Sequence, residues 1–135
     1  MLRVTPKHRS GKALVIAALC LMSVNVLAVE RQRVNDIKPL LLTAIDRGTA
    51  HGVLVGGGAE YIAQHLKSTA PIEIDVKTVA TLREAGCKRL AVTTRQDGVL
   101  DFNRQTRATV PERREFTYEI SYCRDGRIPE GGTQK

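Results

Sequence analysis

The chain has 135 residues, a formal net charge of +7, three cysteines and few aromatic residues. This length suits one small domain, and the sequence contains no catalytic or cofactor-binding signature, so no cofactor is expected. Four of the 21 basic residues and none of the 14 acids lie in the first 28 positions, so removal of that segment lowers the formal charge from +7 to +3. The basic character is therefore poor support for nucleic-acid binding, and we expect no nucleic-acid partner.

Residues 1–28 have the features of a secretory signal peptide. A basic start is followed by an apolar run over residues 13–21, and the small residue Ala28 precedes the predicted cut. The alternative is an uncleaved membrane anchor, but polar residues interrupt the apolar stretch before it reaches the roughly 20 residues that span a bilayer. We predict cleavage after Ala28 and a periplasmic location, with membrane contact only through this segment before cleavage.

The remaining chain is predicted to form a single α+β domain over residues 35–128. Residues 29–34 are polar and are expected to be a flexible N-terminus. Residues 129–135 are expected to be a disordered tail. No internal repeat divides the domain.

Two helices are predicted in the first half of the domain. The first begins near Asn35 or Asp36, which can accept backbone N–H groups, and ends at Gly48. Its apolar residues recur at helical spacing: Ile37, Leu40, Leu41, Ala44 and Ile45. The second helix is predicted from Ala59 and ends before Pro71. Between them, residues 53–55 are either a short strand or an apolar turn.

Three strands are predicted in the second half, over residues 71–80, 87–95 and 114–123. The first and third alternate apolar with polar residues, which is typical of a sheet with one packed face and one wet face. Turns are predicted at residues 83–86, 96–98 and 125–126. The predicted fold is therefore α+β, with two N-terminal helices packed on a small, mainly antiparallel sheet with one disulfide.

The disulfide is predicted between Cys87 and Cys123, which begin the second strand and end the third. One of the three cysteines, Cys20, lies in the predicted leader, so two remain in the mature chain. An even number of cysteines in a short exported chain indicates a disulfide, and two buried free thiols are the alternative. The bond would contribute about 4 kcal/mol to the free energy of unfolding. No metal site is expected, because the cysteines and histidines lack a ligand-like spacing.

Two sequence features are candidates for a small-molecule or catalytic site. The triple glycine of residues 56–58 precedes a helix, but the third glycine of a dinucleotide fingerprint is missing, so a hinge or close backbone packing is favoured over phosphate binding. His51 and His65 are the histidines of the mature chain. Asp46 and Ser68 are near them in sequence, yet no nucleophile motif is present, and both histidines are expected on solvated faces.

A basic loop is the candidate partner-binding element. It contains Arg104, Arg107 and Arg113 within a polar stretch over residues 102–113, and Arg114 follows directly. Phosphate contacts are one interpretation, but an acidic protein surface or lipid headgroups fit a loop with few aromatic residues better. Acidic residues on the wet face of the sheet, and strand edges open for pairing, are also typical of a binding module.

Residues 86–92 (GCKRLAV) and 116–129 (FTYEISYCRDGRIP) carry a resemblance to small exported accessory proteins of bacterial conjugative or type IV secretion loci. The resemblance implies a Gram-negative, periplasmic protein without enzymatic activity. The leading hypothesis is therefore a non-enzymatic periplasmic binding or assembly module with an envelope protein as partner and an unknown oligomeric state. The alternatives are a small exported hydrolase that uses His51 or His65, and an inhibitor of an envelope enzyme that inserts the basic loop.

Overall fold

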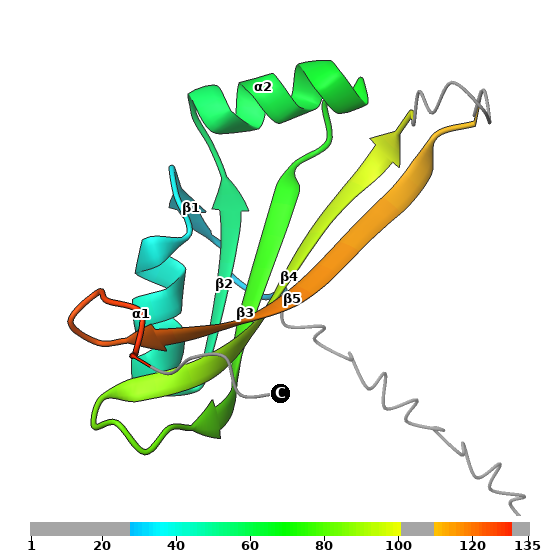
Figure 1. The fold of residues 1–135 in the computed structure, drawn as a ribbon. Helices are drawn as coiled ribbons and strands as arrows, with labels where there is room; N and C mark the ends of the chain where they lie inside the picture. Colours follow the sequence, from blue (N-terminus) through cyan, green and yellow to red (C-terminus); the bar gives the residue numbers. More distant parts are fainter. Residues whose placement is uncertain (1–27, 101–109, 131–135) are drawn as a thin grey trace, which may run out of the picture.

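The computed structural model describes residues 28–100 and 110–130 (Figure 1). Most of the predicted signal peptide, residues 131–135, Arg104 and Arg107 lie outside these ranges. The elements in chain order are β1 (Gln32–Val34), α1 (Lys38–Arg47), β2 (Thr49–Leu54), α2 (Gly57–Leu66), β3 (Ile72–Thr81), β4 (Cys87–Val99) and β5 (Glu112–Cys123). Neither helix of the described ranges is long and apolar enough to cross a membrane.

The five strands form one sheet in the order β1-β2-β3-β4-β5. The β1–β2 pair is parallel and the other three pairs are antiparallel, as predicted for most of the sheet. Residues 32–34, which were expected to be part of a flexible N-terminus, form β1. Because α1 connects two parallel strands, β1, α1 and β2 make a β-α-β unit at one edge of the sheet.

Helix α1 follows the prediction closely. The Asp36 carboxylate accepts the backbone N–H of Lys38 at 2.7 Å, and Gly48 ends the helix with a φ of 87°. The face with the predicted apolar spacing is buried against the inner residues of the central strands. The main core residues are Leu40, Leu41, Ala44, Ile45, Ala50, Ile74, Val76, Leu90 and Val92.

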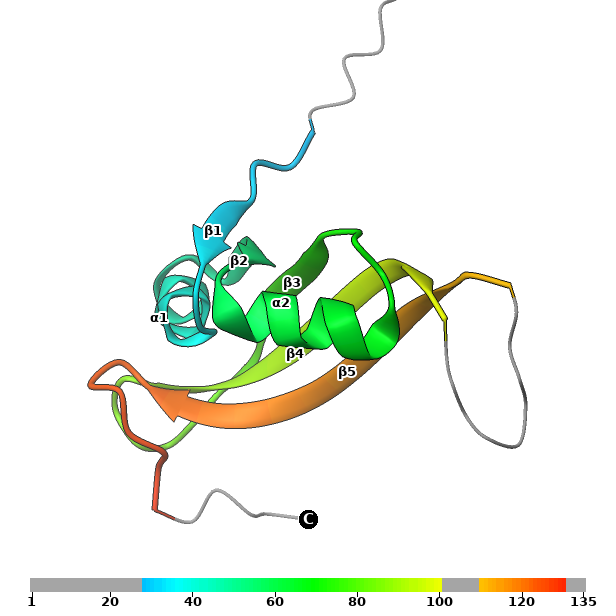
Figure 2. The same ribbon diagram turned by 90° about the horizontal axis from the view of Figure 1, so that it is seen from above.

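Helix α2 differs from the prediction because it does not cover the core. It crosses the ends of the strands (Figure 2), and none of its residues is buried. The segment that follows α2 is held by the β4 residue Gln96, whose amide donates to the carbonyl oxygens of Ser68 and Ala70. The helices also alternate with β1 and β2 instead of preceding the sheet, so the predicted N-terminal helix pair is wrong in order and α1 alone packs on the core.

The predicted turn at residues 96–98 is wrong. These residues lie within β4, where the register with β5 shifts between Gln96 and Val99. Gly98 has a φ of 66° at this irregularity. A β-bulge uses a left-handed glycine just as a tight turn does, so the glycine that predicted a turn and the end of the strand instead lies at a bulge within the strand.

The turns predicted at residues 83–86 and 125–126 are present. Gly86 and Gly126 both have positive φ values, and Gly126 donates its N–H to the carbonyl oxygen of Cys123 at 2.9 Å. The first turn joins β3 to β4, and the second follows β5.

Candidate functional site

The outer edge of β5 is the most accessible part of the sheet. In the described ranges β5 pairs with β4 alone, so the opposite side of this 12-residue strand has no strand partner. Residues 112–119 are exposed and Ile120 is half-buried. We call residues 112–120 the exposed edge. Unpaired N–H and C=O groups of this kind are a template for another strand.

The exposed edge also presents two aromatic side chains on the core face of the sheet. Phe116 lies opposite Thr94 and Tyr118 opposite Val92, and Val92 is a core residue. Nevertheless Phe116 is 66% exposed and Tyr118 is 38% exposed, and their ring centroids are 5.7 Å apart. Figure 1 shows that the β4–β5 hairpin extends away from α1, which is the helix that packs on the core.

Charged residues of both signs line the other face of the exposed edge. Among the described residues, the ion pairs of Arg113 and Glu119 are long, at 3.7 Å to Asp97 and 3.9 Å to Arg89. Glu115 is 4.0 Å from Arg95. Such exposed pairs contribute little to stability, so these groups can be redirected to a partner at small cost.

Two of the four predicted partner-binding arginines lie on this edge. Arg113 and Arg114 belong to β5, although the sequence interpretation placed Arg113 in a loop. Arg104 and Arg107 lie outside the described residues. Both arginines on β5 are exposed, and Arg114 is 3.5 Å from Glu112.

A second candidate is an ionic network on the open face of the sheet, centred on Asp75. Its carboxylate binds Arg31, at 2.8 Å, and Arg95, and it contacts the Nδ1 atom of His51 at 2.7 Å. Arg31 also reaches Glu73 at 3.2 Å. The side chain of Asp75 is about four-fifths buried in this network, so three cationic or ionisable groups converge on one partly desolvated carboxylate.

This network differs from the catalytic arrangement that the sequence suggested. Asp46 pairs with Arg124, and the hydroxyl of Ser68 donates to the carbonyl oxygen of Asp97 at 2.6 Å, so neither residue is engaged by His51. His65 is exposed on α2, and its ring lies 4.0 Å from that of Tyr61. The acid beside His51 is Asp75, one of the polar residues that alternate with apolar ones in β3. Arg31 was missed because its segment lacks any periodic pattern.

The triple glycine has a structural role at the start of α2. Gly56 has a φ of 84° and precedes the helix, while Gly57 and Gly58 form its first turn together with Glu60. A cavity of about 270 Å³ lies beneath, between α2 and the ends of β2 and β3. Its lining is mostly small and apolar, and Glu60 adds a negative charge, which is unfavourable for an anion such as phosphate.

The predicted disulfide is present. It lies at the end of the β4–β5 hairpin where β4 begins and β5 ends, away from the exposed edge. Cys87 and Cys123 are directly paired across the strands, with a Cα–Cα distance of 3.9 Å, and both are almost fully buried. Both cysteines have odd numbers, as the open-face residues of β4 and β5 do. The bond therefore locks the register of the hairpin where the chain turns away from the sheet.

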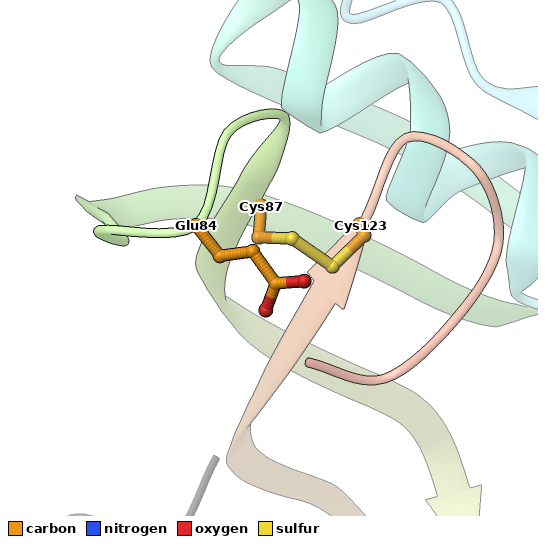
Figure 3. A group of neighbouring side chains, drawn as sticks. All are labelled: Glu84, Cys87 and Cys123. Atoms are coloured by element: carbon orange, nitrogen blue, oxygen red, sulfur yellow. A yellow bond between two sulfur atoms is a disulfide. The ribbon is translucent and has the colours of Figure 1, made fainter. Parts of the chain in front are cut away.

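Glu84 approaches the two cysteine sulfurs, and the three side chains lie together in Figure 3. The cluster has donor types that suit a metal ion, but both sulfurs are joined in the disulfide and offer no thiolate. Glu84 instead pairs with Arg127, which also binds Asp125 at 2.7 Å. The hydrogen bond from Arg127 lowers the pKa of Asp125, and Glu84 raises the pKa of Arg127. This cluster is structural.

Comparison with protein-family models, with curated proteins and with solved structures finds no match to this chain.

Proposed function

We propose that the protein is an exported, non-enzymatic binding or assembly module that acts by strand addition at the exposed edge of β5. The observation that carries this proposal is the coincidence of an unpaired strand edge with two exposed aromatic rings on the core face. Main-chain hydrogen bonds provide affinity in strand addition, and alternate side chains provide specificity. Phe116 and Tyr118 supply the apolar contacts, and the charges on the other face select the partner.

The proposed location is the periplasm, and the proposed setting is an accessory role in a conjugation or type IV secretion apparatus. The signal-like segment and the resemblance of residues 86–92 and 116–129 support this setting. The disulfide is compatible with an oxidising compartment. The basic residues of the leader contribute nothing to the mature surface if that segment is cleaved.

The edge is tested by comparing Phe116→Lys with Ile128→Lys in cross-linking and co-purification from periplasmic extract. The two side chains are matched in exposure, 66% and 65%, but Ile128 follows β5 at the far end of the hairpin. Wild type and Ile128→Lys should recover the same envelope partner or the same self-assembly, and Phe116→Lys should lower recovery about tenfold or more. Undiminished recovery with Phe116→Lys would refute the role of the edge.

Export is tested separately by the intact mass of protein from periplasm, with and without reduction before thiol alkylation. A mass that begins at Val29, with two alkyl groups added only after reduction, is expected. A full-length mass with free thiols would contradict both export and the disulfide.

The second candidate is an exported hydrolase, favoured by the 2.7 Å contact between Nδ1 of His51 and Asp75. A carboxylate in this position orients a histidine for general-base catalysis. In that case His51→Ala should abolish hydrolysis of a model ester or phosphodiester, whereas His65→Ala, which lacks an acidic partner among the contacts described, should not. Equal activity of wild type and His51→Ala would remove this candidate.

A further inference from the structure

The exposed edge of β5 carries a pattern that restricts which strand can pair with it. Residues directly opposite each other in an antiparallel pair point to the same face of the sheet. A strand that pairs with the exposed edge and continues the core face must therefore place an apolar residue on the core face near Phe116. It must place polar residues on the open face. β5 itself satisfies this rule. Its core face carries residues 114, 116, 118 and 120, and its open face carries residues 113, 115, 117 and 119.

We infer that the occupant of the edge is β5 of a second copy, paired antiparallel about a two-fold axis at Phe116. This inference rests on the proposed function, since it names the partner of the same edge. A two-fold axis at a residue keeps the core faces of both copies on one side, whereas an axis between residues would place Phe116 opposite a polar side chain. Axes at Glu115, Phe116 and Thr117 lie nearest the middle of the exposed edge.

Charge distinguishes these three registers. An axis at Glu115 places this residue opposite its own copy, and an axis at Thr117 places Glu115 opposite Glu119 twice. Both registers oppose carboxylates directly, which destabilises a strand pair. The axis at Phe116 instead places Arg113 opposite Glu119 of the second copy, twice, and Glu115 opposite Thr117.

The same register also makes the fullest use of the edge. Phe116 is the midpoint of residues 112–120, so Glu112 pairs with Ile120 of the second copy and the whole exposed stretch is used. The two Phe116 rings lie opposite each other on the core face, and Tyr118 lies opposite Arg114. Aromatic pairs and arginine–aromatic pairs across strands are both favourable. A ten-stranded sheet results, with one α1 near each end.

Arg113 and Glu119 are available for this pairing at low cost. Their intrachain partners are 3.7 and 3.9 Å away, and the four side chains involved are between 34% and 67% exposed. A cross-strand partner directly opposite offers a shorter and better-oriented contact. The predicted intermolecular pairs therefore replace weak contacts.

Sedimentation velocity of the purified protein over a concentration series tests the inference. Wild type should form a dimer, and either Arg113→Glu or Glu119→Arg should raise the dissociation constant about tenfold, because two attractive pairs become repulsive. The double variant Arg113→Glu/Glu119→Arg should restore affinity to within about threefold of wild type. Glu115→Arg, a reversal on the same strand and face, should change it little, because residue 115 opposes Thr117.

Three results would overturn the inference: a monomer up to millimolar concentration, a dimer that is indifferent to the single reversals, or a double variant no tighter than the single variants. Thermal unfolding of each variant identifies any that fail to fold, and the double variant then supplies the decisive comparison. If the protein is monomeric but Phe116→Lys still abolishes capture of an envelope protein, the proposed function stands and the occupant of the edge is a different protein.

Discussion

The two halves of the sheet are built differently. At the β1–β3 side, α1 covers the core face and Leu40 is completely buried against it. In the outer part of β4 and β5 the same face continues with Phe116 and Tyr118, yet no described helix covers it. The covered half obtains its stability from packing, whereas the outer part of the hairpin depends on strand pairing, with the disulfide at the hairpin's other end.

This difference separates the part of the molecule that is stabilised by packing from the edge at which we propose that a partner binds. Substitutions beneath α1 should change folding and leave binding at the edge intact. Substitutions on the exposed edge should do the opposite. The following predictions are arranged by the size of the expected change in the free energy of unfolding.

Removal of the disulfide should have the largest effect. Cys87→Ala/Cys123→Ala should lower the free energy of unfolding by about 4 kcal/mol, because the bond closes a loop between residues 36 positions apart. Urea unfolding measures the change. Reduced wild type should unfold at the same urea concentration as the double variant. Equal stability of oxidised and reduced wild type would show that pairing alone holds the hairpin.

Truncation of one side chain in each half should lower the free energy of unfolding by unequal amounts. Leu40→Ala should cost about 3 kcal/mol, because it leaves a cavity under α1. Phe116→Ala should cost no more than about 0.5 kcal/mol, because the ring is 66% exposed. Both losses of unfolding free energy are measured by urea unfolding of dilute protein, because the edge is unpaired at low concentration. Similar losses at the two sites would contradict the contrast between the halves.

Gly52→Ala tests how closely α1 approaches β2. A Cβ atom at Gly52 would lie 2.6 Å from Cδ1 of Leu40 and 3.1 Å from the carbonyl oxygen of Gln32. The expected cost is about 2 kcal/mol from overpacking. The double variant Leu40→Ala/Gly52→Ala should lose less free energy of unfolding than the sum of the losses of the two single variants. The reason is that the clash between the new Cβ atom and the Leu40 side chain is gone. Strict additivity would mean that the approach is looser than described.

The ionic network on the open face should have the smallest effect. Asp75→Asn should cost about 1 kcal/mol, because Arg31 and Arg95 lose a partly buried partner. The matched change Glu119→Gln, at an exposed pair, should cost about 0.3 kcal/mol or less. When both measurements are repeated in 1 M salt, the difference between the two losses of unfolding free energy should become smaller. A larger loss for Glu119→Gln would show that the edge, and not the centre, carries the electrostatic stabilisation.

The sequence allowed much of the core to be predicted. The apolar spacing of α1, its termination at Gly48 and the alternation in β3 are local patterns, and each is present in the structure. The packed face predicted for β5 is wrong over residues 112–119, which are all exposed, Phe116 and Tyr118 included. The disulfide followed from counting cysteines. These features are decided by periodicity and turn chemistry, which act over a few residues.

Other features depend on contacts between distant residues and could not be read locally. β1 is polar and three residues long, and it becomes a strand only because β2 lies beside it. The ion pairs of Arg31 with Asp75 span 44 positions. Helix α2 has the apolar spacing of a covering helix, but its connections place it across the strand ends. The exposure of Phe116 likewise depends on where α1 ends relative to the hairpin.

The position of β1 also bears on the timing of maturation. The predicted cut after Ala28 lies four residues before Gln32, and Arg31 between them is bound to Asp75 and Glu73. A processing protease needs an extended, unfolded segment around the bond that it cleaves. Once β1 has paired with β2, the residues on the C-terminal side of that bond are held by the sheet. If the leader is cleaved as proposed, its removal and the pairing of β1 with β2 involve the same few residues, and efficient processing requires the cut to come first.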